Sequence, residues 1–202
     1  MYSTDQVEIV KDITMEEVQE IIEFLERADW RDAIGEGASA VVYAYDRFAI
    51  KVPLAEGETD DDIQPLKDLN HLSCTVNLHA IIDNKILITE LIKGDTLRDY
   101  AEWGDYDWFE EGRLEEFEEL LVDILNAGYN PHDLHENNVM LDEVNDRLVV
   151  VDLGWFTPLS QNEFTRSSLQ DGLYDAFEGF TTAFDWAGKV LQGLVNRKAY
   201  YG

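Results

Sequence analysis

The sequence predicts an α+β fold, with a strand-rich front part followed by a helix-rich back part. Two observations carry this prediction. Between residues 33 and 92, short runs of β-branched and aromatic residues alternate with polar or small-residue turns, which is typical of paired strands. From Leu97 onward, the apolar residues recur at helical spacing. A length of 202 residues favours one domain, which has room for two lobes and a sizeable core.

The first predicted element is an amphipathic helix over residues 14–28. Thr14 followed three positions later by Glu17 forms a capping box, which is a signal for a helix start. The apolar stripe of this helix consists of Val18, Ile21, Ile22 and Leu25.

Strand pairs are predicted next. In residues 33–54, apolar β-branched and aromatic residues flank a turn of small residues, which predicts a β-hairpin. A polar loop is expected over residues 56–62, followed by a short helix over residues 63–72 with Pro65 near its first turn, where proline is tolerated. Residues 75–92 predict a second strand pair that turns at Asp83 and Asn84.

The back part begins with the clearest helical pattern of the chain, over residues 113–128, with Gly128 as its stop. Residues 138–154 predict a further hairpin that turns near Asn145 and Asp146. The final stretch, residues 174–200, is predicted to be mostly helical.

The composition argues against nucleic-acid binding through a basic face. Asp and Glu outnumber Lys and Arg by 43 to 15, and a formal charge of −28 repels the phosphate backbone of nucleic acids. The acidity has three interpretations: solubility, adaptation to a high-salt cytoplasm, or attraction of a basic partner, as a DNA mimic would attract one. We expect the acidic face around Glu115, Glu116, Glu118 and Glu119 to be solvated and separable from any catalysis.

The sequence contains no visible signal peptide, and no apolar run approaches the length of a membrane span. Its single cysteine, Cys74, excludes an internal disulfide and suits a reducing compartment. We therefore expect a cytoplasmic protein without membrane contact, either in its own cell or in a host cell.

Residues 131–141, PHDLHENNVML, place several polar side chains directly before a predicted strand. The hairpin that follows puts Asp133 and Asn138 before one strand and Asp152 after the other, so that all three can face one pocket. One carboxylate could accept a hydroxyl proton, while an amide and a second carboxylate hold Mg²⁺. An ordinary polar turn is the alternative interpretation.

This arrangement resembles the catalytic loop and the Asp-Phe-Gly segment of protein kinases. The resemblance implies that Asp133 is the catalytic base, that Asn138 and Asp152 bind the metal, and that ATP and Mg²⁺ are required. His135 takes the place of a lysine that contacts the γ-phosphate, where it could donate to the phosphate or simply brace the loop. Zinc is a weaker interpretation of the histidines, because their spacing does not fit a known zinc motif.

Other motifs of the kinase family follow in the expected order. IGEGASAVVY resembles the glycine-rich phosphate loop, FAIK resembles the segment that carries the phosphate-binding lysine, and ILITELI resembles the hinge, with Thr89 as gatekeeper. Near the end of the chain, Asp185 would secure the catalytic loop. The nucleotide contacts implied by this resemblance are Gly35, Gly37, Ser39, Val42, Ala49, Lys51, Glu90 and Ile92.

The sequence departs from the family at several positions. In kinases a glutamate pairs with the phosphate-binding lysine, and here Asp62 takes that position; Glu56 or Glu58 could substitute, or the pair could be missing. Pro131 and His132 replace the His-Arg of the catalytic loop, which argues against control by activation-loop phosphorylation. The helices that complete the usual back lobe are expected to be missing.

The resemblance implies a single bilobal kinase-like domain over residues 1–202, with a truncated helical C-lobe. Its expected parts are an N-terminal helical extension (1–30), an N-lobe (31–91) and a reduced C-lobe (92–202). The predicted function is that of a minimal Ser/Thr protein kinase, similar to kinases of bacteriophages or secreted bacterial effectors, acting on a protein substrate, for example one of a host. Two alternatives stay open: a small-molecule kinase of the aminoglycoside or choline type, and a non-catalytic acidic protein that binds a basic partner.

Overall fold

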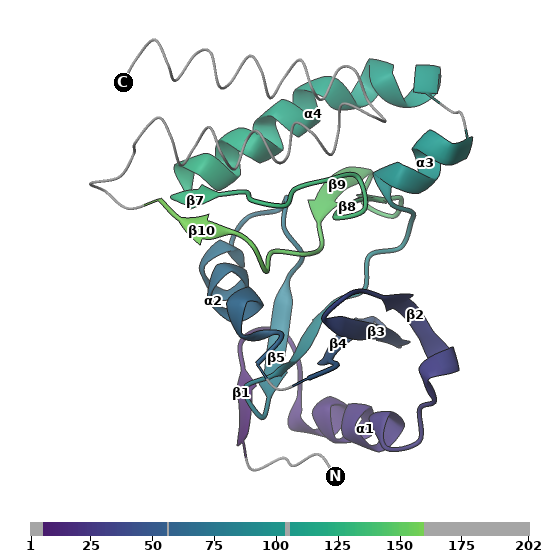
Figure 1. Ribbon diagram of the computed structural model, residues 1–202, viewed down its shortest axis with the longest axis vertical. Helices are drawn as coiled ribbons and strands as arrows, with labels where there is room; N and C mark the ends of the chain where they lie inside the picture. Colours follow the sequence, from purple (N-terminus) through teal and green to yellow (C-terminus); the bar gives the residue numbers. More distant parts are fainter. Residues whose placement is uncertain (1–5, 56, 104–105, 160–202) are drawn as a thin grey trace. The chain divides into compact units, whose positions relative to one another are not determined.

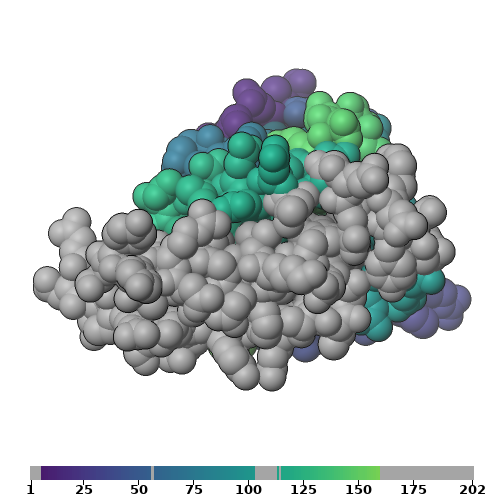
Figure 2. Space-filling model, turned by 90° about the horizontal axis from the view of Figure 1, so that it is seen from above, coloured from purple at the N-terminus to yellow at the C-terminus, as the bar shows by residue number. Residues whose placement is uncertain are grey.

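The protein has an α+β fold. A computed structural model describes residues 6–55, 57–103 and 106–159, and the other residues are grey in Figure 1 and Figure 2. Its described part contains four α-helices, one six-stranded sheet and two small two-stranded sheets. In the six-stranded sheet the order is β1-β5-β6-β4-β3-β2, and all neighbours are antiparallel.

The chain forms two compact units. The first comprises residues 1–71 and 76–92, and the second comprises residues 72–75 and 93–202. The elements of the first unit are β1 (Val7–Ile9), α1 (Met15–Leu25), the short 3₁₀ helix η2 (Trp30–Asp32), β2 (Ala33–Glu36), β3 (Ala40–Tyr45), β4 (Phe48–Pro53), α2 (Asp60–Leu69), β5 (Leu78–Ile82) and β6 (Ile86–Glu90).

Helix α1 begins where the sequence predicted a helix start. The Thr14 side chain accepts from the Glu17 backbone N–H, and the Glu17 carboxylate accepts from the Thr14 backbone N–H at 2.8 Å, which completes the capping box. The same hydrogen bond and the nearby Arg47 guanidinium lower the pKa of Glu17 to about 2. The predicted stripe of Val18, Ile21, Ile22 and Leu25 is buried.

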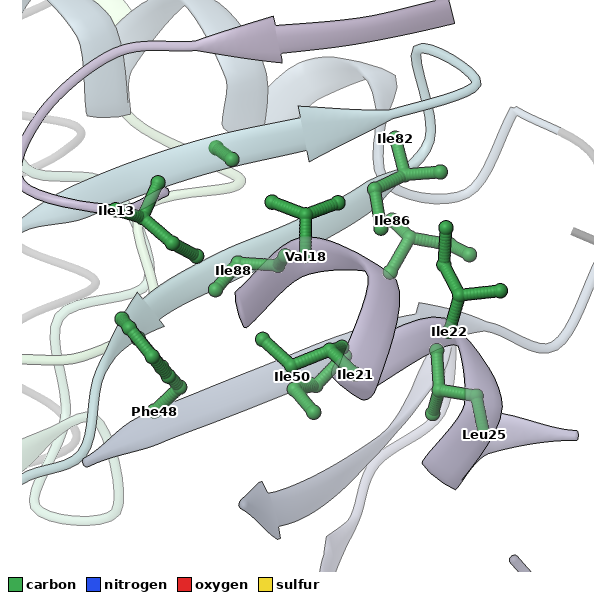
Figure 3. Packing of buried hydrophobic residues seen from close by; sticks show 11 residues of the cluster. Ile13, Val18, Ile21, Ile22, Leu25, Phe48, Ile50, Ile82, Ile86 and Ile88 are labelled. Atoms are coloured by element: carbon green, nitrogen blue, oxygen red, sulfur yellow. The ribbon is translucent and has the colours of Figure 1, made fainter. Parts of the chain in front are cut away.

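The core of the first unit lies between α1 and the sheet. Figure 3 shows Ile21 and Val18 of α1 pointing toward Ile50 of β4 and Ile88 of β6. Each fully buried isoleucine contributes about 1.5–3 kcal/mol relative to an exposed one. Helix α1 is therefore part of this core. Strand β1, which the sequence analysis did not predict, adds a further edge to the sheet beside β5.

The turn between β5 and β6 matches the prediction. Asp83 and Asn84 both have left-handed backbones, with φ of 52° and 55°. Two successive positive φ values are typical of a type I′ turn, and Lys85 N–H closes it by donating to the Ile82 carbonyl at 3.1 Å. Aspartate and asparagine adopt this conformation more readily than other side chains.

Helix α2 differs from the prediction in two ways. It begins at Asp60, so Asp60, Asp61 and Asp62 form its first turn and not a polar loop. Carboxylates are favoured there because the N-terminus of a helix carries partial positive charge. Pro65 is the sixth residue of the helix and lies inside it, not in the first turn.

The second unit begins, in chain order, with segment 72–75, which bonds to its hairpin through Val150 N–H and the Cys74 carbonyl at 2.9 Å. Burial raises the pKa of the Cys74 thiol to about 11, so this cysteine is not a reactive nucleophile at neutral pH. The described elements of the unit are α3 (Leu97–Trp103), α4 (Tyr106–Asn126), β7 (Tyr129–Asn130), β8 (Val139–Asp142), β9 (Arg147–Val150) and β10 (Thr157–Pro158).

Helix α4 is longer than predicted at its start and ends as predicted. Gly128 has φ 88°, and its N–H bonds to the Leu125 carbonyl at 3.1 Å, as expected of a glycine at a helix stop. The hairpin β8–β9 turns at Asn145 and Asp146 as predicted. The buried stripe of α4 consists of Phe117, Leu120, Leu121, Ile124 and Leu125.

Candidate active site

The predicted phosphate-binding hairpin is the turn between β2 and β3. It closes through Gly37 N–H, which donates to the Ala40 carbonyl at 2.9 Å. The Ser39 carbonyl accepts from Leu54 N–H at 2.9 Å, which ties the turn to the end of β4. Val42 pairs with Lys51 across the β3–β4 ladder.

The glycines of this hairpin are not required by its own geometry. A Cβ added at Gly35 would lie 3.9 Å from the Val42 side chain, and one at Gly37 would lie 3.7 Å from the Ala40 carbonyl oxygen. Both are ordinary van der Waals distances, and neither glycine has a left-handed backbone. The fold of the free chain would therefore accept alanine at either position.

Lys51 forms a buried ion pair with Asp62. Its Nζ lies 2.9 Å from Asp62 Oδ2, and the two side chains are 16% and 4% exposed. The pair joins β4 to the first turn of α2. The Glu58 side chain instead accepts from Ala55 N–H nearby in the chain, and Glu56 lies outside the described residues. Asp62, one of the acids considered in the sequence analysis, therefore pairs with Lys51.

The position of α2 is fixed near this pair by Thr59. This residue is fully buried, and its hydroxyl donates to the Lys85 carbonyl just before β6. The bond attaches the start of α2 to the sheet, one turn before Asp62. No sequence motif signalled this contact, because threonine before a helix is ordinarily interpreted as a cap.

The predicted hinge residues follow on β6. Ala49 of β4 pairs with Thr89 of β6, the predicted gatekeeper. Glu90 N–H donates to the Asn77 carbonyl at 2.8 Å, so this N–H already has a hydrogen-bond acceptor within the first unit. Ile92 is buried at the end of that unit.

The loop from residue 131 to 138 carries the candidate catalytic groups of the second unit. Asp133 has a left-handed backbone, φ 56°, and its side chain is 54% exposed. Asn138 Nδ2 donates to the Asp133 carbonyl at 2.9 Å, and Asn138 N–H donates to the His135 carbonyl at the same distance. These two bonds hold the loop conformation between Asp133 and Asn138.

His135 has a defined orientation within this loop. Its Nδ1 accepts from Asn137 N–H at 3.2 Å, so the proton of the neutral ring is assigned to Nε2. Nε2 lies 3.9 Å from Asp133 Oδ1. The ring therefore presents its N–H on the side of the candidate base.

Asp152 follows the second strand of the same hairpin. Val151 N–H donates to the Asn138 carbonyl at 2.9 Å, so Val151 lies opposite Asn138. Asp152 is the next residue along the chain. The Asp152 carboxylate accepts from Gly154 N–H at 3.2 Å. Asn138 uses its amide nitrogen within the loop. Its amide oxygen and the Asp152 carboxylate are oxygen donors of the kind that could hold Mg²⁺.

Two groups of predicted site residues are thus assembled, one in each unit. The first contains the glycine hairpin, Lys51 and the hinge, and the second contains Asp133, His135, Asn138 and Asp152. Asp185, predicted to secure the catalytic loop, lies outside the described residues. Within the described ranges, no cluster of three or more His, Cys, Asp or Glu side chains could hold a metal.

The chain that leads into the second unit passes very close to β8. Leu141 N–H donates to the Asp95 carbonyl at 3.0 Å, and a Cβ at Gly94 would overlap the Leu141 carbonyl oxygen. Gly94 also has φ 152°, so this position requires glycine. Burial, followed by the charges of Asp99 and Glu143, raises the pKa of Asp95.

The acidic face of α4 is not uniformly solvated as expected. Glu116 accepts from Leu148 N–H of β9 and pairs with Arg113 at 2.7 Å, so it has a structural role. Four further acids of this helix line an open hollow of about 570 Å³ that contains none of the predicted catalytic, nucleotide-binding or metal-binding residues. Its lining consists of Glu115, Glu118, Glu119, Val122 and Asp123.

Comparison with protein-family models and with curated proteins finds no match to this sequence. In the part of the chain that the structure describes, every helix is too short or too polar to span a bilayer.

Proposed function

We propose that the protein transfers the γ-phosphoryl group of ATP, with Mg²⁺, to a Ser or Thr hydroxyl of a protein substrate. In this proposal the first unit is the nucleotide-binding N-lobe of a bilobal kinase-like fold, and the second is a reduced C-lobe. The observation that carries the proposal is the ion pair between Lys51 and Asp62.

This pair supports the proposal because it holds a buried carboxylate against a largely covered lysine on a sheet. Removing an ammonium group from water costs several kcal/mol unless it is paired, and a structural strand position is filled at less cost by an apolar residue. The kinase pattern specifies both a lysine on the strand after the glycine hairpin and an acid on the next helix. Lys51 and Asp62 occupy these two positions and lie 2.9 Å apart.

The glycine hairpin gives independent support. Gly35 and Gly37 have neither a steric nor a conformational requirement in the free chain. Glycine costs about 0.5–1 kcal/mol relative to alanine in a regular element. Gly35 lies within β2, so its presence there calls for another reason. Close approach of backbone N–H groups to phosphate oxygens supplies that reason.

In the proposed reaction, Asp133 accepts the proton of the substrate hydroxyl as its oxygen attacks the γ-phosphorus. The bond from that phosphorus to the bridging oxygen breaks, and ADP leaves. Lys51 holds the α- and β-phosphates, and the Nε2–H of His135 lies beside the Asp133 carboxylate. Asn138 and Asp152 would hold Mg²⁺, which neutralises charge on the phosphates. Catalysis would come mostly from positioning and electrostatics.

The first test is incubation of the protein with γ-labelled ATP and Mg²⁺, alone and with a cell lysate. Label on a protein band supports the proposal. Label on a small cationic molecule supports a small-molecule kinase instead, and absence of label in every fraction would contradict phosphoryl transfer.

The matched variant for this test is Asp133→Asn. Asparagine tolerates the left-handed backbone that Asp133 adopts, so the variant removes the charge and keeps the loop conformation. Transfer should be lost while ATP binding is retained, because the base contacts the acceptor and not the nucleotide. Asp46→Asn, at an exposed turn residue with φ 53°, is the control and should be fully active.

A further inference from the structure

Glu136 is a buried carboxylate within the loop that carries Asp133, and the proposed reaction does not use it. Its side chain is 6% exposed, and Oε1 lies 2.9 Å from Arg98 Nη1. Oε2 is buried and has no hydrogen-bond partner among the described residues. The residue stands between His135 and Asn137, in the middle of the loop.

Arg98 holds Glu136 by a second bond, through the backbone. Arg98 N–H donates to the Glu136 carbonyl at 3.1 Å. Arg98 is the second residue of α3, whose start is closed by reciprocal hydrogen bonds between Thr96 and Asp99. Glu136, at the centre of the loop, is thus attached to the start of α3 through both its side chain and its backbone carbonyl.

The charge of Glu136 is not explained by packing. A buried carboxylate with one satisfied oxygen is costly, and an apolar side chain of similar volume would fill the same space at lower cost. An ion pair does, however, impose an orientation that apolar contacts do not. The two groups that depend on the orientation of this loop are Asp133 and Asn138, which themselves are linked by a hydrogen bond.

We propose that the ion pair between Arg98 and Glu136 positions the loop for phosphoryl transfer, with Glu136 as a positioning residue. This inference rests on the proposed function. The pair fixes the backbone from Asp133 to Asn138, so that the carboxylate and the amide oxygen keep their directions when substrate binds.

The test compares Glu136→Ala and Arg98→Ala with Glu102→Ala. Glu102 is the other partner of Arg98, at 2.8 Å, and is exposed, so its removal controls for the loss of an acid from this cluster. The two alanine variants at the buried pair should lower kcat by about 10- to 100-fold, as expected for a small misplacement of reacting groups. KM for ATP should change less than kcat, because the proposed contacts to the nucleotide itself lie in the first unit and only the metal ligands lie in the second.

Two further variants separate positioning from folding. Glu136→Gln keeps an oxygen that accepts from Arg98 and should retain more activity than Glu136→Ala. The double variant Arg98→Ala/Glu136→Ala should be no less active than the worse single variant, because both substitutions remove one interaction. A wild-type kcat in folded Glu136→Ala, or additive losses in the double variant, would overturn the proposal.

Amide hydrogen exchange gives a readout that does not depend on activity. Exchange at residues 134–138 should speed up in Glu136→Ala and Arg98→Ala, while the strands β8 and β9 keep wild-type rates and Glu102→Ala is unchanged. An inactive wild-type protein would refute the proposed function and the catalytic part of this inference. Unchanged loop exchange in Glu136→Ala would refute the positioning role whether or not the protein is active.

Discussion

Replacing Asp62 by alanine should destabilise the protein and weaken phosphoryl transfer. The substitution removes the Asp62 carboxylate from beside the Lys51 ammonium, whose side chain is 16% exposed. Breaking a buried ion pair by removing one partner costs about 3–5 kcal/mol. The residual exposure of Lys51 lets its ammonium reach some water, so we expect a value near ~3 kcal/mol. For a chain of this size, that loss corresponds to a fall in Tm of about 6–12 °C.

Thermal unfolding followed by circular dichroism measures this effect directly. Asp61→Ala is the matched control, because Asp61 is an exposed carboxylate in the same turn of α2. Its Tm should stay within about 2 °C of wild type, since surface substitutions cost little. The double variant Lys51→Met/Asp62→Leu removes both charges and should recover most of the stability, because apolar replacement of a buried pair is often neutral. It should nevertheless be inactive, since Lys51 is the proposed phosphate-binding lysine.

Two results would refute this reasoning. A Tm for Asp62→Ala within about 1 °C of wild type would mean that the pair contributes nothing to the fold. A double variant less stable than either Lys51→Met or Asp62→Ala would mean that the two charges are not coupled.

Four further predictions follow from the structure. Asp152→Ala should abolish the thermal stabilisation that Mg-ATP gives the wild type, and an equal shift in both would contradict the metal assignment. Gly94→Ala should lower the free energy of unfolding in urea by more than about 1 kcal/mol, because of the overlap with Leu141 and the positive φ. The pKa of Glu17 is depressed to about 2, so its stabilising contribution is present above its unfolded value of 4.5 and is lost as the pH falls toward 2. Between pH 6 and pH 2, the free energy of unfolding in urea should therefore fall less for Glu17→Gln than for the wild type. Equal falls would contradict a stabilising role of the Glu17 carboxylate. Neutralising three exposed acids of α4 should leave turnover on a short peptide unchanged and weaken any capture of a basic protein at low salt, whereas lost turnover in a folded variant would place this face in the mechanism. These three acids are Glu115, Glu119 and Asp123.

The design of the last experiment depends on the structure. From the sequence, Glu116 belonged to the same solvated face as its neighbours. Its hydrogen bond with Leu148 of β9 shows that neutralising it would disturb the fold as well as the surface. A variant that includes Glu116 could not distinguish these effects.

Interactions between neighbouring residues determined where several helices and turns of this fold begin and end. The α1 start, the turn at Asp83 and Asn84, and the α4 stop at Gly128 were all predicted, because caps, turn residues and periodicity act over a few neighbouring positions. The candidate site residues could also be proposed from motif order alone, including Asp62 as one of several partners for Lys51.

Tertiary contacts decided the rest. Residues 60–62, where local composition predicted a polar loop, form the first turn of α2, and there Asp62 is buried beside Lys51 of a separate strand. Arg98 and Glu136 are 38 positions apart, and nothing in the local pattern around either one indicates the other. Caps and turns form between neighbouring residues, so a short stretch of sequence is enough to predict them. An ion pair between distant elements forms only when the whole chain brings those elements together, and the energy of the buried charge depends on that final environment.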